Sequence, residues 1–387
     1  MRKVSLLIIF AILCTLIMNG TGTAAEKGNI STAPKKNGDK KWRIAYYEGG
    51  EYIDYKGELV STIKGLMETG WIEHAEIPED KGESTKVTWD WLSTKAKSNY
   101  IQFLKDGHYS ADWDEDIRKR MSAAIIDRVK QKNDVDLLIA MGTWAGKDLS
   151  NNSHKTPTLV LTASDAVSSG IIKSIEDSGY DHINAHVDPL RYERQIRIFH
   201  DIVKFKQLGV AYEDTVEGRS YASLDIIEKL SKELNFEIVK CHTKSDIADK
   251  DAAGESVIKC FDTISKKADA IYVTLQGGVN SKTISKLVEI TNSNKIPTFS
   301  QSGSDEVKEG FLLSQSHSGF KYVGLFHAQT IGKVFNGASP RQLTQIFEGP
   351  PKIAINLKTA EIIGFNPPMI LLGAADEIYN SIGSTQQ

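Results

Sequence analysis

Polar, aromatic and glycine residues stand where several predicted strands end, and they are the residues of this chain that could bind a small molecule. In open α/β sheets, ligands bind at the carboxyl ends of the strands, where such loops gather. The candidate ligand-binding residues are Tyr47, Glu48, Gly142, Thr143, Trp144, Ser164, Asp165, Tyr212, Ser220, Tyr221, Gln276 and Gln301. Glycine, serine and threonine are also normal in turns and helix caps. One such residue at a strand end could therefore be purely structural. The stronger argument for a binding site is that the candidate residues occur together at successive strand ends.

Two features of these loops indicate what would be bound. Gly142 and Thr143 open a predicted helix, where free backbone N–H groups and the helix dipole favour an anion such as a carboxylate. The aromatic members of the set would suit a planar or aromatic ligand, and they would equally suit a hydrophobic core. The loops thus predict a site for a small organic molecule.

No catalytic motif accompanies these loops. The sequence lacks a G-x-S-x-G elbow, a glycine-rich Walker loop and an H-E-x-x-H zinc motif. His182 and His186 lie four residues apart, but their segment has weak helical character and contains a proline, which disfavours a metal site. We therefore expect a binding protein and not an enzyme, without cofactor or bound metal. The histidine segment is interpreted as a connection between domains.

Two cysteines, Cys241 and Cys260, remain once a predicted signal peptide is removed. In an oxidising compartment they could form a disulfide, but spacing in the sequence does not show whether their Cα atoms come close enough. Two separate buried thiols are the alternative.

Alternating strands and helices position these residues. Continuous apolar runs such as 135–140 are typical of buried parallel strands. The predicted strands are 42–47, 135–140, 157–162, 208–212, 236–241, 268–274 and 296–300, and the predicted helices include 59–69, 221–234, 253–266 and 281–292. This order predicts βαβ units in two doubly wound parallel sheets. The chain beyond Trp42 exceeds the size of a single core, which agrees with two such lobes.

Residues 78–120 interrupt this alternation. They carry many charges together with several aromatic residues, which are Trp89, Trp91, Tyr100, Tyr109 and Trp113. We interpret the stretch as a helical insert on the first lobe. Its aromatic residues are expected to form a core of their own and not a ligand cage.

The N-terminus has the pattern of a secretory signal peptide. Arg2 and Lys3 precede an apolar run over 4–18, and small residues lead to Ala25 before charge resumes. The run is shorter than the roughly 20 residues that span a bilayer. A retained anchor is the alternative to cleavage near Ala25. Residues 26–41 are polar and predict a flexible tether. No second apolar run is long enough to cross a membrane, so we expect a soluble protein in the periplasm or outside the cell.

The overall composition excludes one class of partner. The formal net charge is −3, with 40% hydrophobic and 25% charged residues. This is ordinary globular composition, without the basic surplus of nucleic-acid-binding proteins. We therefore expect no nucleic-acid partner, and we expect the protein to be a monomer.

Five segments of the chain carry a resemblance to a known family. They are DLLIAMGTWAGKDLS, TPTLVLTASDAVSSGII, DPLRYERQIRIFHDIVKFKQLGVAYE, the stretch from ADAIYVTLQGG to IGKVFNG, and INLKTAEIIGF. In this order they resemble the ABC-transporter substrate-binding proteins of the tryptophan/tyrosine-uptake type, which have the type I periplasmic-binding-protein fold. The resemblance runs from Trp42 to Pro368, apart from the insert.

This resemblance implies a mechanism, partners and site residues. It implies two lobes, joined by a hinge of about three chain crossings, that close on a ligand. An ABC permease with its ATPase subunits would then take the ligand up. By position, Gly142 and Thr143 match the family's anion-holding turn. Ser164 and Asp165 match its Thr-Asp-Pro element, and Ser220 matches a polar residue at a helix start.

Two departures from the family bear on the ligand. The family often has Thr-Asp-Asn where this chain has Leu275-Gln276-Gly277, so a neutral amide replaces a carboxylate that would hold an amino group. Ala166 also replaces the proline that usually follows Asp165. An amino acid is therefore one candidate ligand, and another aromatic compound is a second.

The resemblance also sets the expected domains and function. Lobe 1 is expected over 42–183 and 318–345, and lobe 2 over 184–317 and 346–382. The expected function is the solute-binding component of an ABC importer. A sensory module that presents its closed form to a membrane receptor or kinase is the alternative, because the fold does not separate the two.

Overall fold

The computed structural model describes residues 30–78, 82–317, 321–349 and 351–383. The predicted signal peptide over 1–25 and the first residues of the predicted tether lie outside this part. The rest of the tether differs from the prediction, because the folded chain holds its backbone. The Trp71 indole donates to the backbone oxygen of Thr32, and the Asn336 amide donates to that of Ala33. Within the described ranges, no helix has both the length and the apolar content to cross a bilayer.

The first sheet has five parallel strands in the order β2-β1-β3-β4-β5. They are β1 (Trp42–Glu48), β2 (Ile101–Ser110), β3 (Leu137–Met141), β4 (Thr158–Leu161) and β5 (Ile183–Ala185). Every residue of β3 is buried, as its continuous apolar run predicts for a central parallel strand covered on both faces.

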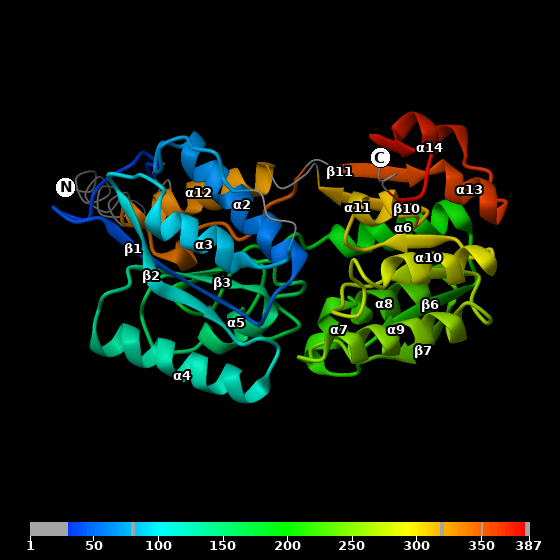
Figure 1. Cartoon of the computed structure of the whole chain (residues 1–387), viewed down its shortest axis with the longest axis horizontal. Helices are drawn as coiled ribbons and strands as arrows, with labels where there is room; N and C mark the ends of the chain where they lie inside the picture. The colour runs from blue at the N-terminus through cyan, green and yellow to red at the C-terminus, as the bar shows by residue number, and fades with distance from the viewer. Residues whose placement is uncertain (1–29, 79–81, 318–320, 350, 384–387) are drawn as a thin grey trace, which may run out of the picture. The chain divides into compact units, whose positions relative to one another are not determined.

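Helices cover both faces of this sheet, so each strand buries alternate residues in two separate cores (Figure 1). From β1, Ile44 and Tyr46 enter one core, while Ala45 and Tyr47 enter the other. The first core is closed by α2 (Ile53–Glu68), α3 (Thr85–Thr94) and α12 (Lys321–Phe335), and the second by α4 (Glu115–Gln131) and α5 (Gly142–Leu149).

Helix α12 comes from the far end of the sequence yet packs along α2. The two backbones approach closely at Gly65 and Gly324. A Cβ at Gly65 would overlap the backbone oxygen of Gly324, and a Cβ at Gly324 would overlap that of Ser61. Only glycine permits this approach, which brings side chains of both helices together beside the first sheet.

The second sheet has seven strands in the order β12-β11-β10-β9-β8-β6-β7. They are β6 (Gln207–Tyr212), β7 (Glu237–His242), β8 (Ala270–Val273), β9 (Thr298–Ser300), β10 (Leu313–His317), β11 (Pro351–Asn356) and β12 (Glu377–Tyr379). The pairing of β10 with β11 is antiparallel, and the other pairs are parallel.

Helices also cover both faces of the second sheet. One core is closed by α6 (Arg191–Val203), α8 (Leu224–Leu234), α13 (Leu357–Ile363) and α14 (Met369–Ala374), and the other by α9 (Lys250–Ile264) and α10 (Ile284–Ser293). Shorter elements are α7 (Val216–Tyr221), α11 (Ser304–Lys308) and the 3-10 helix η1 (Pro340–Gln342). The predicted α/β architecture of two parallel-sheet lobes is confirmed.

The helical insert predicted over 78–120 is wrong in its topology. The stretch contains α3, but also β2, which pairs with β1 and forms the edge of the first sheet. Trp89 is buried in the core of that lobe, against Tyr46 and Phe103. The sequence does not indicate this strand, because β2 lies at an edge, where exposed charged residues interrupt its apolar pattern.

Between the described elements, the chain passes from one sheet to the other three times: from β5 to α6, from β10 to α12, and from η1 to β11. The first and third crossings are hydrogen-bonded to each other. The Val187 N–H donates to the backbone oxygen of Gln345, and the Phe347 N–H donates to that of Val187. A multi-crossing hinge, as predicted, therefore joins the lobes.

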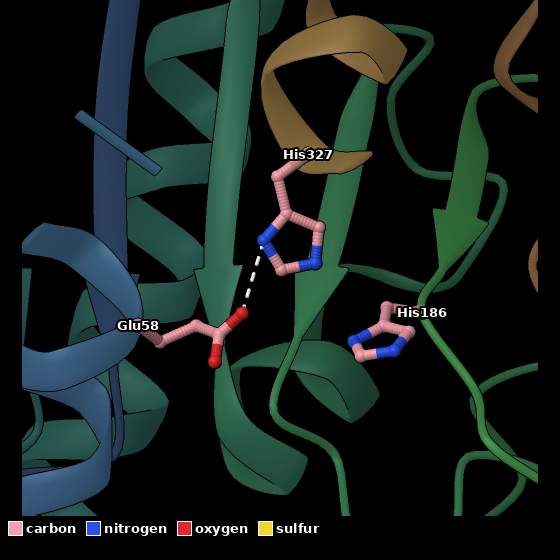
Figure 2. Close-up of side chains that lie close together, drawn as sticks. All are labelled: Glu58, His186 and His327. Atoms are coloured by element: carbon pink, nitrogen blue, oxygen red, sulfur yellow. Dashed lines mark ion pairs between the residues drawn. The ribbon is translucent and has the colours of Figure 1, made fainter. Parts of the chain in front are cut away.

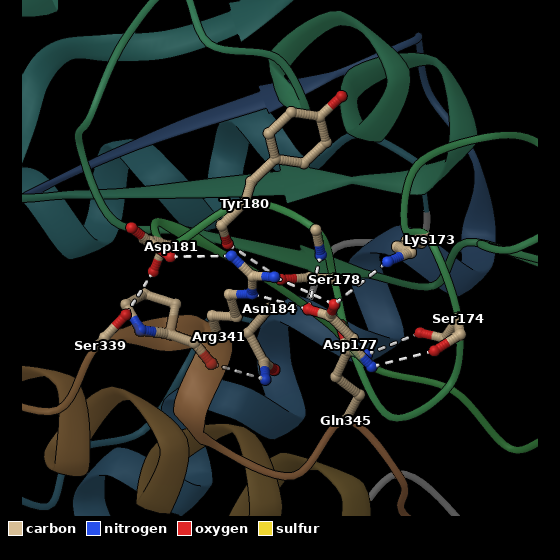
Figure 3. Close-up of polar contacts among 12 residues, drawn as sticks. Lys173, Ser174, Asp177, Ser178, Tyr180, Asp181, Asn184, Ser339, Arg341 and Gln345 are labelled. Carbon is tan, nitrogen blue, oxygen red and sulfur yellow. Dashed lines mark hydrogen bonds and ion pairs between the residues drawn. The ribbon is translucent and has the colours of Figure 1, made fainter.

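Polar contacts fix the third crossing to the first lobe (Figure 3). The Arg341 guanidinium forms ion pairs with Asp177 at 2.6 Å and Asp181 at 3.1 Å. The Gln345 amide donates to the backbone oxygen of Ser174, and the Asn184 amide donates to that of Pro340. The returning chain is thus held by β5 and by the loop that precedes it.

A disulfide joins Cys241 on β7 to Cys260 on α9, with Cα atoms 5.6 Å apart. It fastens the edge strand of the second sheet to a covering helix across 19 positions of sequence. Closing a loop of this length restricts the unfolded chain and raises the free energy of unfolding by about 3 kcal/mol.

Replacing both cysteines by alanine is expected to lower the free energy of unfolding by about 3 kcal/mol, because the unfolded chain regains that freedom. Urea unfolding followed by circular dichroism measures the change. A reducing agent should destabilise the wild-type protein similarly and leave the double variant unchanged. Equal urea midpoints for oxidised and reduced wild-type protein would contradict the prediction.

Candidate ligand-binding site

A cavity of about 390 Å³ lies among the strand-end loops of both sheets and the first crossing. This volume falls within the usual range for small-molecule sites. The first lobe contributes the start of α2, with Tyr52, Asp54 and Tyr55, together with Trp113 and other residues. The site is therefore built where open α/β sheets place their ligands.

The second lobe and the crossing supply the remaining wall. Tyr221 at the end of α7 and Asp246 after β7 face the cavity from the second lobe. Arg191 and Tyr192, the first residues of α6, line it where the chain leaves the crossing. Aromatic rings and charged groups thus surround one volume, and no single lobe provides all of them.

Four of the predicted site residues line this cavity: Thr143, Ser164, Tyr221 and Gln276. Thr143 lies in the first turn of α5 with 1% of its surface exposed, and its hydroxyl has no hydrogen-bond partner among the described residues. A buried hydroxyl without a partner is costly unless a ligand or water supplies one. Thr143 is therefore well placed to bind a ligand.

Gln276 lines the cavity but is committed to the protein itself. Its amide nitrogen donates to the backbone oxygen of Ala211 and to the Thr274 hydroxyl, both at 2.9 Å. Its amide oxygen accepts from the Thr243 hydroxyl at 2.7 Å. The side chain ties three strand ends together, which explains a neutral amide at this position.

Two predicted residues at the end of β1 do not line the cavity. The Tyr47 hydroxyl donates to Asp148 in the core. Glu48 is buried and accepts from the hydroxyls of Tyr46 and Thr85, and burial raises its pKa to about 7. Both side chains belong to the interior of the lobe.

Gly142, at the start of α5, lies just behind the cavity wall. It has a φ of 81°, and a Cβ there would overlap the Tyr55 hydroxyl. Glycine is required so that Tyr55 can pack against the start of the helix. Its neighbour Trp144 is buried, with the Arg118 guanidinium 4.4 Å from its ring centroid.

The remaining predicted residues organise neighbouring loops. The Asp165 carboxylate accepts from the backbone N–H of Ser168, and its backbone oxygen accepts from the Ser220 hydroxyl. Tyr212 packs on the ring of His242. The Gln301 amide donates to the backbone oxygen of Tyr221. None of these predicted residues lines the cavity, because their polar atoms or rings are turned to the protein.

The two histidines of the predicted connecting segment separate. His182 is buried against His154, with ring centroids 4.6 Å apart, while His186 lines the cavity. The four-residue spacing does not bring their rings to a common point, because the segment is a strand end and not a helix.

Sequence reasoning missed the charged residues that face the cavity. Arg191 donates one N–H to the backbone oxygen of Gln301 at 3.3 Å, and its Nε has no partner among the described residues. The charge of this guanidinium opposes the effect of burial on the pKa of Asp54. The only sequence signal for Arg191 is its place at the start of a helix, and it belongs to no recognisable motif.

Burial perturbs the acidic residues of the cavity. It raises the pKa of Asp54 to about 6, although the nearby Arg191 favours the charged form. It raises the pKa of Asp246 to about 7, and the hydrogen bond that Asp246 accepts from the Ser245 hydroxyl only partly offsets the effect. Both carboxyls would be stabilised as anions by a cationic group between the lobes.

Replacing Asp246 by asparagine is expected to flatten the pH dependence of stability. The unfolded carboxyl keeps its ordinary pKa, so between about pH 4 and 7 the folded state binds more protons and stability falls as pH rises. The variant should lose less stability over this window, by up to about 4 kcal/mol. Urea unfolding between pH 4 and 8 measures both proteins.

The exposed Asp251 provides the matched control for this experiment. Its side chain is 82% exposed. It lies in the first turn of α9, whose first residue, Lys250, lines the cavity. Asp251→Asn should follow the wild-type pH profile. Parallel profiles for wild type and Asp246→Asn would show that Asp246 is not protonated by burial.

Comparisons with known proteins agree with this geometry. A family model described as ABC transporter substrate binding protein matches residues 109–378. A tyrosine-binding protein of Clostridioides difficile strain R20291 is 23% identical over 215 residues, which are 52% of this chain and 58% of that protein. The match thus spans little more than half of that relative's length.

Solved structures share the fold. A conserved domain protein from Vibrio cholerae has a TM-score of 0.66 at 18% identity, and an ABC domain from Streptococcus pneumoniae in complex with L-Trp has 0.65 at 17%. The ligand-free, open structure of a substrate binding protein with adhesive properties from Clostridium difficile has 0.57 at 17%. Each comparison covers 88% of this chain and 100% of the other.

These structures confirm the predicted type I periplasmic-binding-protein fold, and the family model confirms the predicted resemblance. The model covers most of the chain, including the strand-end loops of the second lobe and the third crossing. The chain therefore belongs to the ABC transporter substrate-binding protein family.

Proposed function

We propose that this protein captures an aromatic amino acid, or a closely related amine-bearing aromatic compound, and delivers it to an ABC permease with its ATPase subunits. It acts outside the cytoplasm as a binding protein without catalytic activity. The observation that carries the proposal is the cavity itself, which combines a guanidinium, buried carboxyls and aromatic rings from both lobes.

Arg191 is proposed to bind the ligand carboxylate. Its Nε is buried without a partner among the described residues, and guanidinium N–H groups form strong charge-assisted hydrogen bonds to carboxylates. Thr143 and Ser164 line the same cavity from the first lobe and offer hydroxyls to this end of the ligand. The carboxylate would thus contact the crossing and the first lobe together.

Asp246 is proposed to hold the ligand ammonium group. It faces the cavity from the second lobe, and an ammonium ion would favour its charged form, which burial otherwise disfavours. The rings of Tyr55, Tyr192 and Tyr221 line the remaining wall and suit an aromatic side chain. The similarity to a tyrosine-binding protein and to a domain solved with L-Trp supports this ligand class.

The lobes are proposed to close on this ligand. Lobe 1 comprises the first sheet with α12, and lobe 2 comprises the second sheet. Contacts already join loops of the two lobes: Lys147 pairs with Glu217 at 2.5 Å, and the Ser220 hydroxyl donates to the backbone oxygen of Asp165. A ligand that contacts both lobes favours the closed form, because only that form provides all its contacts.

Ligand analogues test which end of the molecule is recognised. L-tyrosine and L-tryptophan are expected to raise the melting temperature. Tyrosinamide, which lacks the carboxylate, and 4-hydroxyphenylpropionate, which lacks the amine, should bind at least about tenfold more weakly, as expected when a charge-assisted hydrogen bond is lost. Thermal shift and calorimetry measure this series. Failure of both amino acids to bind would contradict the proposal.

Variants test the residues within the same series. Arg191→Gln should lower the affinity for L-tyrosine about 10- to 100-fold, because it removes the charge that faces the carboxylate. Tyr47→Phe is the matched control, since it removes a hydrogen bond outside the cavity. Equal affinities for Arg191→Gln and wild type would refute the role of Arg191.

A further inference from the structure

A carboxylate and two imidazoles meet at the cavity floor from three separate parts of the chain (Figure 2). Glu58 lies on α2, His327 on α12, and His186 in the crossing that follows β5. One ligand atom from each side chain lies within 4.8 Å of the other two. Glu58 and His186 line the cavity, and His327 is only 1% exposed.

Glu58 and Thr62 fix the orientation of the His327 ring. The Glu58 Oε1 lies 3.0 Å from Nδ1 of His327, and the Thr62 hydroxyl lies 3.2 Å from the same nitrogen. The Thr62 hydroxyl donates to the backbone oxygen of Glu58, so it can only accept from Nδ1. The proton of the neutral ring is therefore on Nδ1, and Nε2 has a free lone pair.

The lone pair of Nε2 is the feature that the contact between Glu58 and Nδ1 does not explain. Nε2 is buried and has no hydrogen-bond partner among the described residues. Figure 2 shows this nitrogen on the side of the ring that faces His186, and the two ring centroids are 5.1 Å apart. Nε2 of His327, the imidazole of His186 that it faces, and the Glu58 carboxylate beside both rings together offer a set of metal-ligand atoms.

We propose that Glu58, His186 and His327 form a binding site for a divalent transition metal, with zinc as the best match. Nε2 of His327, one ring nitrogen of His186 and one oxygen of Glu58 are the ligands. Two imidazoles and a carboxylate are a known zinc donor set that leaves a further position open. Magnesium and calcium are disfavoured, because they prefer oxygen ligands throughout.

Metal binding would draw the three side chains together. Ligands about 2 Å from a tetrahedral zinc lie about 3.3 Å apart, so the cluster must contract from its present spacing. The Thr62 hydroxyl can still accept the hydrogen bond from Nδ1–H of His327 when the Glu58 carboxylate turns toward the metal. The open position would face the cavity, because Glu58 and His186 line it.

The metal would also connect the hinge to one lobe. Glu58 and His327 belong to helices of the first lobe, whereas His186 lies in the first crossing, next to the paired Val187. Zinc would fasten this crossing to α2 and α12. The inference does not depend on the proposed organic ligand, since the metal is tested alone.

Zinc titration of the purified, chelator-treated protein tests the site. Calorimetry should show one equivalent of Zn²⁺ bound with protons released, because the metal competes with protons for its ligands. Glu58→Gln, His186→Asn and His327→Gln should each weaken zinc binding at least about tenfold. Circular dichroism checks that each variant folds, and His186→Asn removes the ligand that is least buried.

His200→Asn is the matched control. This histidine lies on α6 in the second lobe and contacts Phe205 and Phe236, away from the cluster. It should bind zinc as the wild type does. Absence of saturable zinc binding by the wild type would overturn the proposal. Wild-type affinity in the folded ligand variants, or an equal loss in His200→Asn, would overturn it as well.

Discussion

The hydrogen bonds between two chain crossings are the constraint on which the binding site depends. Val187 in the first crossing pairs with the segment 345–347 of the third, so the two run side by side between the sheets. Arg341 and Gln345 then fix the third crossing to the first lobe. A pair of crossings held in this way permits bending at the hinge and opposes sliding of one lobe past the other.

This constraint places the cavity floor within a few residues of the hinge. His186 precedes the pairing residue, and Arg191 and Tyr192 follow it at the start of α6. Gln195 fixes the start of α6 to the second sheet. Its amide nitrogen donates to the backbone oxygen of Gln315, and its amide oxygen accepts from the Tyr272 hydroxyl. The group proposed to bind the ligand carboxylate therefore stays in place when the lobes move, which reduces the ordering that binding must impose.

The sequence allowed the layers of the fold to be predicted, and only part of the site. Apolar runs such as 137–141 identify central strands because both faces of a parallel sheet are covered. The edge strand β2 lacks such a run, and the predicted helix over 221–234 is broken at Ser223, which has a φ of 52°. Strand-end positions identified Thr143 and Ser164. Arg191 and Asp246 could not be found in this way, because tertiary packing alone brings a helix start and a distant loop to the same cavity.

The replacement of a family carboxylate by Gln276 has a physical reason in this arrangement. The Gln276 amide needs both a donor and an acceptor to join Ala211, Thr274 and Thr243, and a carboxylate offers only acceptors. An aspartate there would leave the backbone oxygen of Ala211 without that donor and add a second carboxylate to a cavity lining that already contains Asp246, whose ionisation burial opposes. The negative charge of the second lobe's wall is instead supplied by Asp246, which follows β7, two strands away from β8 across the sheet. An acidic group is therefore retained in this wall, at the end of a different strand, so the departure from the family pattern does not argue against a ligand that carries an amino group.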